Sequence, residues 1–162
     1  MESLLFVADR PTTADQIAKA MEIDAGAVEE ALSELEQQLA ARGVRLQRKG
    51  LQVQMVSMPE AAPDIQRFLG LELTGRLTQP ALETLAIVAY RQPATRATLE
   101  SIRGVNCDAV LKTLLSRGLI EEMGRLEQAG RPILYGTTFE FLQYFGLRSL
   151  NDLPPLETGA EE

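Results

Sequence analysis

Residues 11–32, PTTADQIAKAMEIDAGAVEEAL, and residues 93–114, PATRATLESIRGVNCDAVLKTL, carry one pattern twice, 82 positions apart. The matching residues pair without a gap: Pro11 with Pro93, Thr13 with Thr95, Ile17 with Leu99, Ile23 with Val105, Ala27 with Ala109, Val28 with Val110 and Leu32 with Leu114. Each copy predicts an apolar helix, a proline turn, a short helix, a longer helix ending at Arg-Gly, and two short strands. This order is typical of a winged helix-turn-helix, which binds nucleic acid or protein. We therefore expect a mainly α (α+β) protein of two tandem winged-helix domains, each with a three-helix core and a small β-hairpin wing.

Local signals mark the ends of the elements in the first copy. Thr13 and Gln16 have the spacing of a capping box, and Asp24 can cap the third helix. Gly43 is expected to end that helix in the left-handed conformation. A Lys49-Gly50 turn joins the two wing strands.

A further helix should close each copy, over residues 59–70 and 138–146. Their apolar residues are expected to face inward: Ile65, Phe68, Leu69, Leu142 and Phe145. We place domain boundaries at 1–75 and 76–148, with a linker at 71–78 and an acidic, partly disordered tail at 149–162.

Composition narrows the class of protein. The chain has 162 residues, a net charge of −7 and one cysteine, Cys107, which excludes an internal disulfide. No apolar run reaches the roughly 20 residues needed to span a bilayer, and the N-terminus lacks the features of a secretory signal. We expect a soluble cytoplasmic protein without a membrane contact.

Catalytic chemistry finds no support in the sequence. There is no histidine, so a histidine-based triad or histidine metal site cannot be built. Cys107 follows the Asn106 cap, where a structural role is expected. Glu121 and Glu122 are neighbours on a strand and face opposite sides. No catalytic residue, metal or cofactor is predicted.

DNA binding is the main alternative, because winged-helix proteins usually insert the third helix into the major groove. In the first copy this helix carries Glu29, Glu30, Glu34 and Glu36, which would repel phosphates. Residues 76–148 hold nine Lys or Arg against seven Asp or Glu, so their arginines are either solvated, in contact with a protein, or in weak contact with DNA. The best evidence for a DNA-binding transcription regulator is the wing of the first copy, which holds Arg45, Arg48 and Lys49.

Longer strings in the second copy carry a family resemblance: ALETLAIVAYRQPATRATLESIRGVN (81–106), VLKTLLSRGLIEEMGR (110–125), GRPILYGTTFEFLQYFGL (130–147) and SLNDLP (149–154). These strings closely resemble the segregation and condensation protein B (ScpB) family, and ESLLFVADRP (2–11) in the first copy is similar to it more loosely. Cys107 and Phe139 depart from the residues expected at their positions.

The resemblance implies a non-enzymatic subunit of the bacterial SMC condensin-like complex. Such a subunit would form a homodimer and bind the kleisin ScpA, which bridges the heads of the SMC ATPase. It would act at the nucleoid in chromosome condensation and segregation, with DNA contacted weakly or indirectly. A tandem winged-helix transcription regulator stays the alternative.

Two surfaces are predicted for these partners. The first copy holds more apolar side chains than one small core needs, so its helix and wing should form the dimer interface through Leu4, Leu5, Phe6, Val53, Met55 and Met58. In the second copy, arginines at turns can reach an acidic partner and aromatic residues can anchor it. The predicted kleisin-binding residues are Arg103, Arg125, Arg131, Tyr135, Phe139 and Tyr144.

Overall fold

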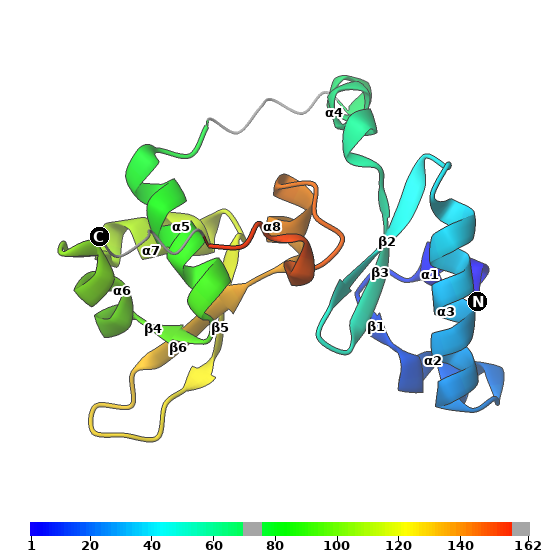
Figure 1. Ribbon diagram of the computed structural model, residues 1–162, viewed down its shortest axis with the longest axis horizontal. Coiled ribbons are helices and arrows are strands. Elements are labelled where there is room, and N and C mark those ends of the chain that lie inside the picture. Colours follow the sequence, from blue (N-terminus) through cyan, green and yellow to red (C-terminus); the bar gives the residue numbers. More distant parts are fainter. Residues whose placement is uncertain (70–75, 157–162) are drawn as a thin grey trace. The chain divides into compact units, whose positions relative to one another are not determined.

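The computed structural model describes residues 1–69 and 76–156, which divide into two compact units. The first unit contains Met1–Ala62 together with the described chain from Gly146 onward, and the second lies within Pro63–Phe145 (Figure 1). This division differs from the expected boundaries, because the segment after Phe145 contacts the first unit. The linker expected at 71–78 lies largely outside the described residues.

The first unit packs three helices on one small sheet. It contains α1 (Glu2–Val7), β1 (Thr12–Thr13), α2 (Ala14–Met21), α3 (Ala25–Leu39), β2 (Val44–Lys49), β3 (Gln52–Ser57) and the short turn η1 (Pro59–Ala61). The sheet is antiparallel in the order β1-β3-β2, so β2 is an edge strand. The core combines one buried residue of α1 with the apolar stripes of α2, α3 and the strands: Leu5, Ile17, Ala18, Val28, Leu32, Leu35, Leu39, Leu46 and Val53.

The second unit repeats this order of elements. It contains α5 (Gln79–Arg91), β4 (Ala94–Thr95), α6 (Arg96–Arg103), α7 (Asp108–Ser116), β5 (Ile120–Arg125), β6 (Ile133–Thr137) and α8 (Phe139–Tyr144). Its antiparallel sheet has the order β4-β6-β5, with β6 in the centre. The chain is therefore a mixed helix and sheet protein with two small antiparallel sheets.

Most of the predicted caps are confirmed. The Thr13 side chain accepts from the Gln16 backbone N–H while the Gln16 side chain accepts from Thr13 N–H, which completes the capping box. Asp24 Oδ2 accepts from Gly26 N–H at 2.7 Å. The prediction for Gly43 is wrong: α3 already ends at Leu39, and Gly43 has no positive φ. Gly43 belongs to the start of the hairpin instead, where its carbonyl accepts from Met58 N–H at 2.9 Å.

The prediction that several apolar side chains of the closing helices face inward is also wrong. α4 (Ala62–Leu69) buries none of its residues, and Phe68 and Leu69 are 88% and 57% exposed, because no described element covers its apolar face. In the closing helix of the second unit Leu142 is fully buried, as predicted. Phe145 is 43% exposed, because the helix ends at Tyr144 and Phe145 lies just beyond it. Within residues 1–69 and 76–156, no helix has the length and apolarity to cross a bilayer.

Candidate functional site

An apolar face of α1 is open on the first unit. Phe6 and Val7 are 77% and 72% exposed and Leu4 is 36% exposed, whereas Leu5 alone points into the core. A six-residue helix that buries one side chain leaves the others to solvent, so the hydrophobic run Leu4–Val7 is split between core and surface. The exposed side chains Leu4, Phe6 and Val7 form the first candidate interaction site.

The structure divides the predicted dimer residues. Leu4 and Phe6 are accessible, but Leu5 and Val53 are core residues at 3% and 2% exposure, so their assignment to an interface is corrected. Met55 is partly buried against the same core, and Met58 lines a pocket described below. Val7 and Leu51 belong to the same helix and hairpin, whose surplus of apolar side chains was expected to form the interface, and both are exposed (Leu51 at 86%).

The predicted kleisin residues do not form one patch. Tyr135 and Phe139 are both 7% exposed, which corrects their assignment to a surface. Tyr135 is buried because β6 is the central strand, and this burial raises the pKa of its hydroxyl. Arg103, at the end of α6, is held in an ion pair with Glu83 of α5, and only 14% of its side chain is exposed.

The remaining candidates lie on two separate parts of the second unit. Arg125 and Arg131 belong to the β5–β6 hairpin, where Arg125 Nη1 donates to the Arg131 carbonyl at 3.1 Å. Tyr144 is 48% exposed on α8 and makes an edge contact with Phe145. Figure 1 shows α8 apart from the far end of this hairpin.

The hairpin also exposes apolar side chains that the sequence reasoning missed. Met123 and Leu126 are 54% and 38% exposed. A β-bulge between Glu122 and Gly124 interrupts the alternation of β5, so the inward or outward direction of Met123 could not be read from a period of two. Two arginines and two apolar residues thus gather on one hairpin, which is the second candidate interaction site.

Ion pairs neutralise charged side chains of α6 and α7 in the second unit. Arg96 bonds Glu100 through Nε at 2.8 Å and Asp108 through Nη1 at 2.9 Å, and Lys112 pairs with Asp108 at 3.0 Å. The Cys107 backbone N–H donates to Glu100, which lowers the pKa of that carboxyl group, and Arg96 lowers it further. The Lys112 hydrogen bond lowers the pKa of Asp108. Arg96 and Lys112 are therefore balanced by Glu100 and Asp108.

Two basic side chains of β2 in the first unit are similarly bound to groups of the protein. Arg48 bonds Glu36 at 2.6 Å and Glu29 at 2.8 Å. Burial opposes the charge of Arg48, but the hydrogen bonds and charges of Glu36 and Glu29 together raise its pKa. Arg45 Nη2 donates to the Leu147 carbonyl at 3.0 Å. Arg45 and Arg48, which favoured DNA binding in the sequence, thus bind groups of the protein itself.

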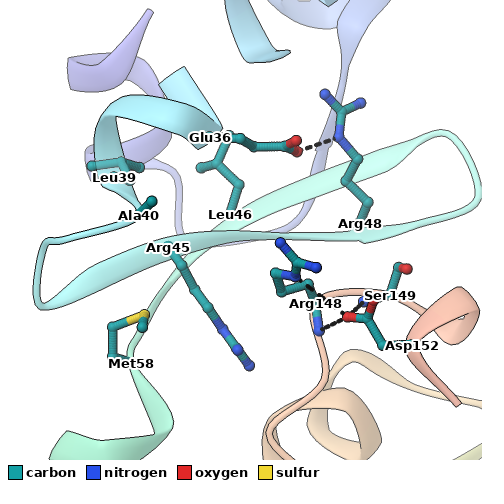
Figure 2. A pocket seen from close by; sticks show the side chains of 10 residues that line it. All are labelled: Glu36, Leu39, Ala40, Arg45, Leu46, Arg48, Met58, Arg148, Ser149 and Asp152. Atoms are coloured by element: carbon teal, nitrogen blue, oxygen red, sulfur yellow. Dashed lines mark hydrogen bonds and ion pairs between the residues drawn. The ribbon is translucent and has the colours of Figure 1, made fainter. Parts of the chain in front are cut away.

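A pocket of about 380 Å³ lies on the first unit beside β2. It is lined by residues at and just after the end of α3, by residues of β2, by the residue that follows β3 and by the segment after Gly146: Glu36, Leu39, Ala40, Arg45, Leu46, Arg48, Met58, Arg148, Ser149 and Asp152. Figure 2 shows the Glu36–Arg48 pair on α3 and β2, and Asp152 turned back onto the backbone of Arg148 and Ser149. Over residues 1–69 and 76–156, no three Cys, Asp or Glu side chains gather as a metal site would require.

Known proteins resemble the chain over nearly its whole length. The model of the family described as segregation and condensation complex subunit ScpB matches residues 1–156. Segregation and condensation protein B of Moorella thermoacetica is 49% identical over 159 residues, which cover 97% of this chain and 81% of that protein. The protein of the same name from Bacillus cereus (strain ATCC 10987) is 47% identical over 165 residues, covering 100% of this chain and 87% of the relative. The crystal structure of ScpB from Mycobacterium tuberculosis is 41% identical and covers 90% of this chain and 92% of that one, with a TM-score of 0.45.

Proposed function

We infer what this chain does from its family: it belongs to the segregation and condensation protein B (ScpB) family and has a role in chromosome segregation and condensation. We propose that it is a non-enzymatic subunit of the SMC condensin-like complex, acting at the nucleoid and bound to the kleisin ScpA. The match to the family over residues 1–156 is the observation that carries the proposal. ATP chemistry would belong to the SMC ATPase, reached through the kleisin.

The two units are proposed to be tandem winged-helix modules. Support comes from the recurring order of helix, short strand, two helices and two strands, and from the three-stranded sheet in each unit. In this interpretation the β2–β3 and β5–β6 hairpins are the wings. Ion pairs hold the helices of both modules, which suits a role in binding proteins more than one in reading DNA.

We place homodimerisation on the first unit. Leu4, Phe6 and Val7 form an exposed apolar face on α1, and exposed apolar side chains are favoured at the buried centre of an interface. A stable interface covers about 800 Å² on each partner, so elements beyond α1 would have to contribute.

We place the kleisin contact on the β5–β6 hairpin of the second unit. Met123 and Leu126 supply apolar area there, and Arg125 and Arg131 supply positive charge for an acidic segment. Tyr144 on α8 stays a second, separate candidate. Arg103 is disfavoured, because a partner would have to displace Glu83 from it.

The transcription regulator is not favoured. Such a protein needs cations free to meet phosphates, whereas Arg48, Arg96 and Lys112 are already paired with carboxylates. Any contact with DNA is proposed to be weak or indirect.

Calorimetry of the full-length chain with purified ScpA tests the proposal. We expect saturable binding that Met123→Asp and Arg125→Glu weaken by about tenfold or more, the range of an interface hot spot. Arg91→Glu is the matched control, because it makes the same change of charge at an exposed residue of α5 that is not part of the hairpin. Absence of any ScpA binding would refute the family-based role, whereas binding that both hairpin variants leave unchanged would refute only the surface.

A further inference from the structure

A groove opens on the first unit where α2, α3 and the turn of the β2–β3 hairpin meet. Its volume is about 260 Å³, and its lining combines small side chains, two carboxylates and one leucine: Thr13, Ala14, Asp15, Ala25, Gly26, Glu29 and Leu51. We call it the α2–α3 groove. Leu51 is 86% exposed, so a large apolar side chain is accessible at its rim. A site that encloses a whole small molecule usually measures about 300 to 1,000 Å³, so this groove suits one or two side chains of a larger partner.

The second unit shows what fills the equivalent space. The 82-residue repeat pairs Ala14 with Arg96 and Gly26 with Asp108, and α2 and α6 are both eight residues long and both follow a capping threonine. Arg96 Nη1 donates to Asp108 Oδ1 at 2.9 Å, so an ion pair bridges α6 and α7. The alanine and the glycine in the first unit are too short to form such a bridge. The α2–α3 groove therefore corresponds to a space that the second unit fills with a guanidinium group.

Carboxylates at the groove can bind a cation that a partner supplies. Asp15 is exposed and forms no ion pair within residues 1–69 and 76–156. The Glu29 side chain is 51% exposed, and Arg48 bonds its Oε2 atom at 2.8 Å. A carboxylate has about four acceptor positions, so Glu29 can accept further hydrogen bonds while it stays paired with Arg48.

The surroundings of the groove carry a surplus of negative charge. Residues 14–39 hold seven Asp or Glu and one lysine. When Arg48 and Lys49 of the adjacent hairpin are counted with them, four negative charges remain in excess. Exposed Glu30 contributes to this surplus on α3, whereas its counterpart in the second unit is Lys112. The acidic character is therefore specific to the first unit, and it complements a basic partner.

We propose that the α2–α3 groove binds a basic segment of a partner protein, one of whose arginines enters the groove. The guanidinium group of this arginine would occupy the space that corresponds to Arg96 in the second unit and would bond the carboxylates of Asp15 and Glu29. A neighbouring apolar side chain of the segment would cover Leu51. The site lies on the first unit, goes beyond the proposed kleisin contact on the β5–β6 hairpin, and does not depend on it.

A basic protein segment fits the groove better than nucleic acid or a small cation. Phosphate groups would meet the same carboxylates and be repelled by them. A small cation would bind Asp15 and Glu29 but leave Leu51 in water, whereas a protein segment can combine a cation with an apolar contact. Arginine suits the groove better than lysine, because its planar guanidinium group can donate two parallel hydrogen bonds to one carboxylate.

Backbone NMR of the full-length protein tests the site. The probe is a blocked hexapeptide of alternating arginine and leucine. One control peptide alternates glutamate with leucine, and the other alternates arginine with serine. We expect the probe to shift the amide signals of Asp15, Gly26 and Leu51 to saturation. Each control peptide should bind at least about fivefold more weakly, because it lacks either the cation or the apolar side chain.

Two variants with matched controls locate the binding. Ala14→Arg introduces the residue that Arg96 provides in α6, so the protein's own side chain should fill the groove and weaken binding about tenfold or more. Ala20→Arg makes the same change of charge at an exposed position of α2 outside the groove, and binding should stay within about threefold of the original. Leu51→Ser should weaken binding about fivefold or more, whereas Phe68→Ser removes an apolar side chain at 88% exposure on α4 and should leave binding unchanged.

Leu51→Ser changes an exposed turn, so it should keep the fold and decides the question even if Ala14→Arg fails to fold. Equal binding of the glutamate peptide would overturn the proposal. Signal shifts that spread over the acidic surface, and that Leu51→Ser leaves unchanged, would overturn it in favour of unspecific attraction. Arginine hydrochloride that reproduces the shifts of the probe would assign the groove to a small cation. Groove signals that move with protein concentration alone would assign it to a second copy of the chain.

Discussion

Replacing Phe6 on the exposed face of α1 should weaken the proposed homodimer without unfolding the protomer. Burying a phenylalanine side chain contributes about 1.5 to 3 kcal/mol, and 77% of Phe6 is exposed in the single chain, which leaves about 1 to 2.3 kcal/mol per protomer for an interface. A two-fold symmetric interface uses this side chain twice. Phe6→Ser should therefore raise the dimer dissociation constant about 30-fold to about 2,000-fold.

Sedimentation equilibrium across a range of protein concentrations measures this change. Phe68→Ser is the matched control, because Phe68 is the same residue at 88% exposure on α4, outside the proposed interface. The thermal midpoint of both variants should stay close to that of the unchanged protein, since neither side chain lies in a core. An unchanged dissociation constant in Phe6→Ser, or an equal change in Phe68→Ser, would refute the assignment of the dimer to α1.

Three other outcomes are expected. In gel shifts, retardation of DNA by the isolated protein should be sequence-blind and vanish between about 50 and about 200 mM salt, and sequence-selective binding that survives the higher salt would revive the regulator. Glu100→Gln should lower stability to denaturant at pH 7. The hydrogen bond from Cys107 N–H, and after it the one from Arg96, lowers the pKa of Glu100 in the folded protein. The contribution of Glu100 to folding stability is therefore present above the unfolded pKa of about 4.3 and is lost as the pH falls through the lower folded pKa. The difference between variant and original should thus shrink at acid pH, and a constant difference would contradict this account. A stop after Phe145 removes the segment from Gly146 onward, and with it the hydrogen bond from Arg48 N–H to the Arg148 carbonyl. Hydrogen exchange of the Arg48 amide should then accelerate at least about tenfold, which corresponds to the loss of about 1.4 kcal/mol. Unchanged exchange would show that this segment does not protect the amide.

Features that depend on a few neighbouring residues could be predicted from the sequence. The capping box of Thr13 and Gln16 and the cap at Asp24 act over two or three residues, so the spacing alone carries the information. The repeated order of elements follows from the same short-range signals. The family resemblance, carried by long strings rather than by periodicity, led to the family that the comparisons identify.

Side-chain exposure and the pocket depended on contacts between distant parts of the chain. Leu4 and Leu5 are adjacent and chemically identical, yet only packing against β3 decides which of them is buried. Tyr135 is a core residue because its strand is central in the sheet, an order that no local pattern encodes. The Gln47 side-chain amide donates to the Leu147 carbonyl, a residue 100 positions away in the sequence. Such pairing depends on which groups the folded backbone leaves unsatisfied, and this is decided only when the sheet has formed.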